Sequence, residues 1–313
     1  MKDILLQGTP GHPQVDAIVQ KVVQVYENAF PGKIAAYYIE GSYADQTYLH
    51  TSDIDLTIVF RSPFADTTAR NVVEQTWTSK QVGTQEVDIT VVDEASLREG
   101  VHPSMKLGSR LIYGQDVCSL YPLLSIEAWT RDRMQAAYWL LVNVYQRRIP
   151  VQLALTFPSP ADEFYGYTNR TLRLPDGREV PCTRNLVRTT GWAATALLAL
   201  QAGQYVGRKR DCVRLYRDHI GDEWTALLED IIVSCRDQWR YLIPDAHHAR
   251  KHLRELCERT LQFERHFLLF YKSYLLKQFR SAEQEDVRFA IWLQEQLPLD
   301  DVEVATALQT LAR

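Results

Sequence analysis

An apolar stretch in the first third of the chain carries two aspartates separated by a single residue. It reads EGSYADQTYLHTSDIDLTIVF over residues 40–60. Successive side chains of a strand point to opposite faces, so Asp53 and Asp55 share one face and the apolar residues share the other. Two neighbouring carboxylates repel each other unless a cation or a proton neutralises them. The stretch therefore predicts a strand with one core face and one face whose charge a cation or a proton must neutralise.

A second short stretch, EVDITVV at residues 86–92, predicts another strand and contains a third carboxylate, Asp88. If this strand pairs beside the first, Asp53, Asp55 and Asp88 converge at one end of a small sheet. Hard divalent cations prefer oxygen ligands, and Mg²⁺ often binds a few carboxylates together with the phosphates of a substrate. We therefore predict that the three aspartates are metal ligands and catalytic residues.

A glycine and a serine precede the first of these strands. Gly41 lets the backbone approach a phosphate closely, and Ser42 adds a hydroxyl at the expected start of a short helix. Two metal ions beside a triphosphate can activate an attacking oxygen and stabilise the leaving group of a displacement at phosphorus. A D-x-D pair alone more often lies at a solvated strand end, but the whole series of motifs predicts nucleotidyl transfer.

The chain divides into two parts that differ in their hydrophobic pattern. The first, residues 1–120, alternates predicted helices and strands, which favours a small mixed sheet flanked by helices. Its expected elements are a helix over 14–28, a strand over 33–40, a helix over 67–80 and the two carboxylate strands. The second, residues 121–313, predicts an all-α helical bundle that closes over the substrate and the nucleotide. Its long amphipathic stretches are 128–147, 184–201, 224–239 and 246–279.

The N-terminal motifs resemble the DNA polymerase beta-like nucleotidyltransferase superfamily. The pattern of that superfamily is a Gly-Ser turn, a D-x-D strand and a later third carboxylate, and this chain matches it over about residues 34–92. The resemblance implies that Gly41 and Ser42 contact the triphosphate and that the three aspartates hold the metals.

Residues of about 184–217 are similar to the aminoglycoside adenylyltransferases of the streptomycin/spectinomycin type, which join such a domain to a helical bundle. By this similarity, Lys209 of the GRKRD segment contacts the nucleotide phosphates. Arg208 and Arg210 flank it and are alternatives one position away. Without the resemblance, the basic run would be interpreted as a solvated face.

Together these features predict a metal-dependent enzyme that moves a nucleoside monophosphate, with AMP from ATP as the leading case, to a hydroxyl of a small-molecule acceptor. The expected cofactors are two Mg²⁺ ions, with ATP or another nucleoside triphosphate as co-substrate, and the aminoglycosides are one candidate class of acceptor. The alternative is a nucleotide-binding regulatory or antitoxin-like protein whose partner is another protein.

Charge and hydropathy limit the other partners. The net charge is −4 and the sequence pI is about 6.1, so a long nucleic acid is not expected. The N-terminus has only three consecutive apolar residues before Gln7, too few for a secretory signal, and no long uncharged stretch predicts a membrane span. We expect a cytoplasmic protein.

An irregular excursion between residues 157 and 182 interrupts the helical pattern with repeated prolines and glycines, and Asp176 and Gly177 predict a hairpin turn. Loops often carry function, which makes Glu163, Tyr165 and Tyr167 candidate contacts to the acceptor. The alternative is that the excursion only links two helices and caps the bundle with its tyrosines.

Overall fold

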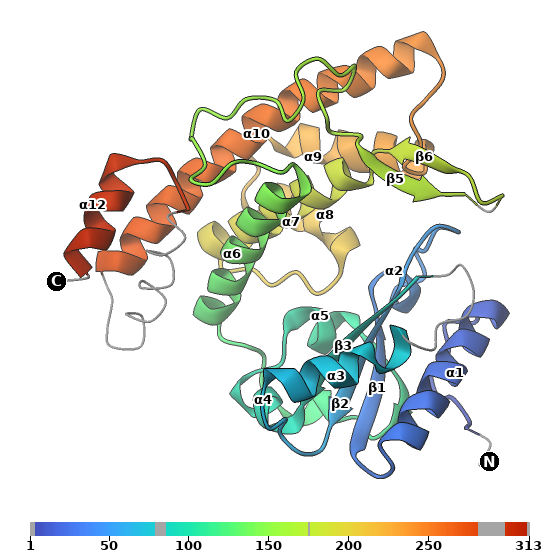
Figure 1. Ribbon diagram of the computed structural model, residues 1–313. Coiled ribbons are helices and arrows are strands. Elements are labelled where there is room, and N and C mark those ends of the chain that lie inside the picture. Colours follow the sequence, from blue (N-terminus) through green and yellow to red (C-terminus); the bar gives the residue numbers. More distant parts are fainter. Residues whose placement is uncertain (1–3, 79–85, 175, 281–297, 312–313) are drawn as a thin grey trace. The chain divides into compact units, whose positions relative to one another are not determined.

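The computed structural model describes residues 4–78, 86–174, 176–280 and 298–311, and these form two compact units (Figure 1). Unit 1 comprises Met1–Trp129 and Tyr205–Asp211, and unit 2 comprises Thr130–Gln204 and Cys212–Arg313. The two units therefore interleave in the sequence, whereas the prediction divides the chain once, after residue 120. The short segment Tyr205–Asp211 groups with unit 1 although its neighbours on both sides belong to unit 2.

A four-stranded mixed sheet forms the centre of unit 1, with the strand order β3-β2-β1-β4. The strands are β1 (Ile34–Glu40), β2 (Ile54–Phe60), β3 (Val87–Asp93) and β4 (Arg110–Gly114). Strand β2 runs parallel to β3, while β1 is antiparallel to both β2 and β4. The predicted small mixed sheet is confirmed, and β4 is a strand that the hydrophobic pattern did not indicate.

One face of the sheet packs against two helices, α1 (Pro13–Ala29) and α3 (Thr67–Thr78). Helix α1 forms because its apolar residues recur at helical spacing, and this stripe is buried against the sheet. The helix predicted over residues 14–28 is thus confirmed. The last two residues of the helix predicted over 67–80 lie outside the described residues.

The opposite face of the sheet has two different halves. Near one end it is covered by α4 (Glu94–Glu99) and α5 (Pro103–Gly108), whose Leu97 and Met105 belong to the same buried cluster as Tyr38. At the other end of the same face the strands carry carboxylates. The alternation predicted for β2 is confirmed, since Ile54, Leu56, Ile58 and Phe60 all belong to the α1-facing core.

Unit 2 is helical, with one small hairpin. Its described helices are α6 (Ile126–Val144), whose first turn still belongs to unit 1, α7 (Arg184–Ala202), α8 (Cys212–His219), α9 (Thr225–Ile231), α10 (His247–Arg280) and α12 (Val302–Leu311). Helix α7 contacts α8 and α10, and α10 also contacts α9 and α12. The hairpin pairs β5 (Arg170–Arg173) with β6 (Glu179–Cys182), around the predicted turn. The helix predicted over 224–239 is α9 followed by π-helical turns over Ile232–Gln238.

Within the described ranges, no helix combines the length and the apolar character needed to cross a membrane.

Candidate active site

A row of three carboxylates crosses three neighbouring strands of unit 1. Glu40 of β1 is paired with Asp55 of β2, and Asp55 is in turn paired with Asp88 of β3. Paired residues of adjacent strands project to the same face of a sheet, so the three side chains stand side by side. Asp53 precedes Asp55 by two residues, and oxygens of Asp53, Asp55 and Asp88 lie within 4.8 Å of one another. The predicted convergence of the three aspartates is confirmed.

Glu40 is the member of this row that the sequence analysis missed. Thr57 Oγ1, which is buried, donates a hydrogen bond of 2.5 Å to Glu40 Oε1 and fixes the glutamate on the carboxylate face. The signal for it was its position next to Gly41 at the end of an apolar strand, but only the pairing register places it opposite Asp55. We call Glu40, Asp53, Asp55 and Asp88 the acidic corner.

Gly41 connects the Gly-Ser turn to this corner. It opens the short helix α2 (Gly41–Ala44) with a φ of +63°, a conformation that favours glycine. A Cβ atom at Gly41 would lie 2.2 Å from Asp55 Oδ2, which leaves no room for any side chain. The turn that precedes β2 therefore packs its backbone directly on the carboxylate of Asp55, and Ser42 follows at the next position.

Asp55 shows how strongly the charges in the corner interact. Its pKa is raised to about 6, in the first place because the carboxyl group is buried. The Lys209 ammonium opposes this rise, and the carboxylates of Asp53, Asp88 and Glu40 add to it. The corner thus gathers negative charge in a partly buried place, where a positive charge lowers the free energy of the ionised state.

The donor set fits a hard divalent cation such as Mg²⁺. All of the grouped ligand atoms are carboxylate oxygens, which is the chemistry that Mg²⁺ and Mn²⁺ prefer over Zn²⁺ or copper. Asp53 and Asp55 are half-buried, whereas Asp88 is exposed. The corner therefore has two sheltered carboxylates and one that solvent and a substrate can reach.

The basic segment that follows α7 belongs to unit 1 and lies near the acidic corner. Its residues Lys209–Asp211 form a 3₁₀ turn. Arg210 pairs with Asp45, with Nε 3.8 Å from Oδ2 and Nη1 donating to the backbone oxygen at 3.3 Å. The side chain of Arg208 lies beside Gly108. Of the three adjacent basic residues, Lys209 has the largest electrostatic effect on Asp55.

The predicted acceptor contacts lie in unit 2, where they differ in exposure. Glu163 keeps half of its side chain exposed and accepts a hydrogen bond from Arg250 Nε at 2.8 Å. Tyr165 is stacked on Phe157, with ring centroids 4.0 Å apart, and its hydroxyl donates to Glu258. These contacts hold the excursion against α10.

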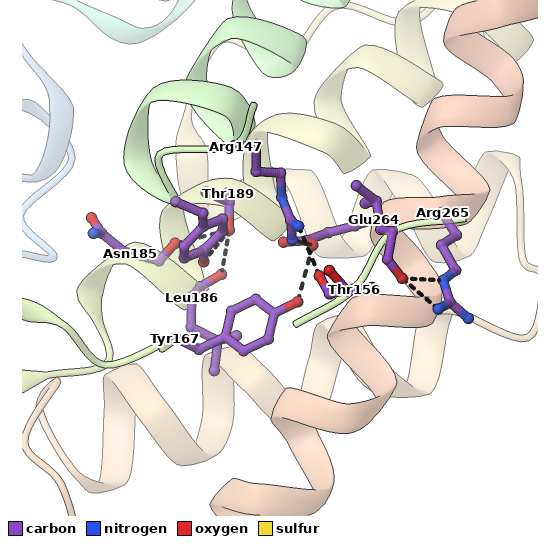
Figure 2. Close-up of polar contacts among 10 residues, drawn as sticks. Arg147, Thr156, Tyr167, Asn185, Leu186, Thr189, Glu264 and Arg265 are labelled. Carbon is purple, nitrogen blue, oxygen red and sulfur yellow. Dashed lines mark hydrogen bonds and ion pairs between the residues drawn. The ribbon is translucent and has the colours of Figure 1, made fainter. Parts of the chain in front are cut away.

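Tyr167, the third of these residues, is fully buried. Its hydroxyl donates to Glu264 Oε2 at 3.0 Å, and Arg147 Nη2 donates to the same oxygen at 2.5 Å (Figure 2). Arg147 also donates to the backbone oxygen of Thr156. Tyr167 thus belongs to a polar network inside the helical unit, and the role of all three residues toward an acceptor stays a prediction.

Three solved structures are among those similar to the chain. Spectinomycin adenyltransferase AAD(9) from Enterococcus faecialis, in complex with ATP and spectinomycin, is 14% identical, with coverage of 79% of this chain and 98% of that chain and a TM-score of 0.47. The CD-NTase CdnG from Bradyrhizobium diazoefficiens, in complex with GTP, is 15% identical, with 98% and 95% coverage and a TM-score of 0.26. A toxin-antitoxin structure with AMP-PNP is 20% identical, with 39% and 94% coverage and a TM-score of 0.25.

Because these TM-scores are low, the ligands of those structures are not assigned to this chain. A comparison with curated proteins gives no match. The family model described as "Nucleotidyltransferase domain" matches residues 19–115, which include most of α1, the four strands of the unit 1 sheet and the acidic corner. The sequence-based prediction of a nucleotidyltransferase is confirmed by this match, and unit 1 contains a nucleotidyltransferase domain.

Proposed function

We propose that this chain transfers a nucleoside monophosphate, AMP from ATP as the leading case, to a hydroxyl of a small-molecule acceptor and releases pyrophosphate. The observation that carries the proposal is the in-register row of Glu40, Asp55 and Asp88, with Asp53 beside it and Gly41 packed on the Asp55 carboxylate. A structural sheet edge has no use for four carboxylates on one face, because their repulsion destabilises the fold.

The residues of the corner take different roles in this proposal. Asp53, Asp55 and Asp88 would hold Mg²⁺, two ions in the sequence-based prediction, and bound Mg²⁺ supplies charge neutralisation at the triphosphate. Gly41 and Ser42 present backbone and a hydroxyl to the phosphates. Asp88 is exposed, so its carboxylate can also accept the proton of the acceptor hydroxyl.

Lys209 is the proposed phosphate contact among the three basic residues. Its ammonium already acts on the acidic corner, whereas Arg210 is engaged by Asp45 and the side chain of Arg208 lies beside Gly108. A lysine at this place balances the charge of a triphosphate that approaches the carboxylates.

The acceptor is proposed to be a hydroxylated or cationic small molecule, with aminoglycosides as one class to test. The half-exposed carboxylate of Glu163 is suited to such a molecule. Long nucleic acids do not fit the net charge of −4. A cytoplasmic location stays a prediction.

The test is a transfer assay on the purified chain with Mg²⁺. Each of the four nucleoside triphosphates, labelled at the α-phosphate, is incubated with panels of aminoglycosides and hydroxylated metabolites, and pyrophosphate and labelled product are measured. We expect pyrophosphate release that needs both Mg²⁺ and an acceptor, and an Asp53→Asn variant serves as the matched inactive control.

Two outcomes contradict the proposal in different ways. Nucleotide binding without turnover on any acceptor would favour a nucleotide-binding regulatory protein with a protein partner. Turnover that is unchanged in Asp53→Asn would place the chemistry outside the acidic corner.

A further inference from the structure

The segment Tyr205–Asp211 reaches unit 1 from a distant part of the sequence and is attached to it at both ends. The hydroxyl of Tyr205 donates to the backbone oxygen of Leu124 at 2.7 Å. At the other end, Arg210 pairs with Asp45, a residue with only 4% of its side chain exposed, in the loop that follows α2. Lys209 lies between these two attachments.

A contact between two glycines joins the middle of the segment to α5. A Cβ atom built on Gly108, the last residue of α5, would lie 2.2 Å from the backbone oxygen of Gly207. A Cβ atom on Gly207 would lie 2.5 Å from the Cβ of Leu107 and 3.3 Å from the backbone oxygen of Pro103. Each glycine therefore permits an approach that any side chain at the same position would prevent.

Neither glycine is required by its own backbone conformation. Gly108 and Gly207 are absent from the positive-φ glycines of the described residues, so other residues could adopt their dihedral angles. The requirement for glycine is then purely one of space between two segments. This differs from Gly41, whose positive φ and whose contact with Asp55 both demand glycine.

The consequence concerns Lys209, which follows Gly207 by two residues. The first turn of the chain after the glycine contact is the 3₁₀ turn that begins at Lys209. Its ammonium acts electrostatically on Asp55. A displacement of the segment away from α5, by the width of one methyl group, moves the lysine relative to the carboxylates, and a charged contact to phosphate is sensitive to such a shift.

We infer that Gly108 and Gly207 are positioning residues for nucleotide binding, because their contact sets the distance between Lys209 and the acidic corner. The inference rests on the proposed function, in which Lys209 contacts the nucleotide phosphates. It adds that the two glycines act through the lysine and not through contact with the nucleotide.

The experiment is a calorimetric titration of the full chain with ATP and Mg²⁺. We expect Gly108→Ala and Gly207→Ala each to weaken ATP binding roughly ten- to a hundredfold, the range expected for loss of a charge-assisted contact. The matched control is Gly191→Ala, on helix α7, where a Cβ atom would meet nothing within 4 Å and ATP affinity should stay unchanged.

Two further variants separate positioning from general damage to the fold. Adding Gly108→Ala to Lys209→Ala should weaken ATP binding no further, because both act through the same ammonium. Adding Leu107→Gly to Gly207→Ala removes the Cβ that causes the clash and should restore most of the affinity, whereas a second glycine in α5 would aggravate a purely structural defect.

The outcomes distinguish this inference from the proposed function. A wild-type chain that binds none of the four nucleoside triphosphates in the presence of Mg²⁺ would overturn both. Wild-type binding that is lost in Lys209→Ala but kept in Gly108→Ala and Gly207→Ala would overturn the inference alone. Additive losses in the Lys209 and Gly108 double variant, or no rescue by Leu107→Gly, would also overturn it.

Discussion

The acidic corner and the Arg147–Glu264 pair are both sheltered groups of charged side chains. They differ because the corner has mostly negative charges, whereas the pair has one charge of each sign. In the acidic corner four carboxylates share one end of a sheet. Burial, and after it the neighbouring carboxylates, raise the pKa of Asp55, and Lys209 opposes this rise. In the helical unit, Arg147 meets Glu264 at 2.5 Å, with 7% and 2% of the two side chains exposed (Figure 2). Tyr167 donates to the same glutamate.

The difference indicates that the acidic corner is suited to bind a cation, whereas the Arg147–Glu264 network stabilises the helical unit. Opposite charges at contact distance neutralise each other, so the Arg147–Glu264 pair needs no ligand. The hydrogen bond from Tyr167 to the same glutamate connects the excursion to α10. Like charges raise the free energy of the metal-free fold and lower it again when a cation arrives. Removing one charge should therefore have opposite effects on stability at the two places.

The largest expected effect is on catalysis at the acidic corner. Asp53→Asn or Asp55→Asn should lower the rate of nucleotidyl transfer by at least about a thousandfold, roughly 4 kcal/mol of barrier, because each removes a metal-ligand charge. The measurement is the steady-state rate of pyrophosphate release at saturating Mg²⁺. Glu264→Gln is the control, since it removes a carboxylate of the other cluster. A wild-type rate in Asp53→Asn would contradict the assignment of the corner.

The next effect is on stability in the helical unit. Glu264→Ala should lower the free energy of unfolding by about 3 kcal/mol, because it leaves the Arg147 guanidinium buried without its partner. Combining Arg147→Met with Glu264→Leu should recover most of this loss, because no charge is then left unpaired. Chemical denaturation followed by circular dichroism measures both variants.

A matched control for that comparison is the exposed pair of Lys251 and Glu255, 3.9 Å apart on α10. Lys251→Met should change the unfolding free energy by less than about 0.5 kcal/mol, because solvent screens the pair. If Glu264→Ala lowered the free energy of unfolding no more than Lys251→Met, the buried Arg147–Glu264 pair would not stabilise the fold as its burial indicates.

Much of unit 1 could be predicted from the sequence because its signals are local. Alternation in β2 and the order of the motifs predicted that three aspartates converge if the two carboxylate strands pair, and β2 and β3 do pair. The place of Glu40 depends on the register between β1 and β2, which no local pattern contains. Strand β4 and helix α5 are five and six residues long, too short to establish a periodicity.

The association of Tyr205–Asp211 with unit 1 could not be predicted from the sequence either. It includes a contact between Gly108 and Gly207, which are nearly a hundred residues apart in sequence and have no side chain to reveal a pattern. The assignment of Lys209 came from a family resemblance for this reason, and not from its spacing. Arg208, Lys209 and Arg210 are all exposed, so the basic run is solvated in the fold and the role of Lys209 toward a nucleotide stays a prediction.

A smaller effect concerns the pH dependence of stability without metal. The pKa of Asp55 in the fold, about 6, exceeds its unfolded value of 3.8, so the folded chain binds the proton more tightly. The resulting stability is fully present below pH 3.8 and is lost as the pH rises through about 6. Asp55→Asn lacks this titration and should gain about 1 to 2 kcal/mol relative to the wild type between pH 4 and pH 7, allowing for solvent screening.

The measurement is denaturant unfolding of both proteins in the presence of a chelator. Excess Mg²⁺ should reduce or reverse the advantage of Asp55→Asn, because the cation stabilises only the chain that still has the full set of carboxylates. An advantage that does not vary with pH would show that the gain comes from packing and not from charge repulsion.

The smallest expected effect on stability is at Glu163, which belongs to neither cluster. Its ion pair with Arg250 is half-exposed, so Glu163→Gln should change the unfolding free energy by less than about 1 kcal/mol. A contribution this small leaves the carboxylate available for another partner.

If the acceptor binds the Glu163 carboxylate, Glu163→Gln should raise the acceptor KM several-fold while the KM for ATP stays unchanged. Asp176→Asn, which alters a similarly exposed pair with Arg178 in the same excursion, should leave both KM values unchanged. Equal acceptor KM values in wild type and Glu163→Gln would mean that the excursion only caps the helical bundle, because a charged contact to a bound molecule cannot be removed without a cost in affinity.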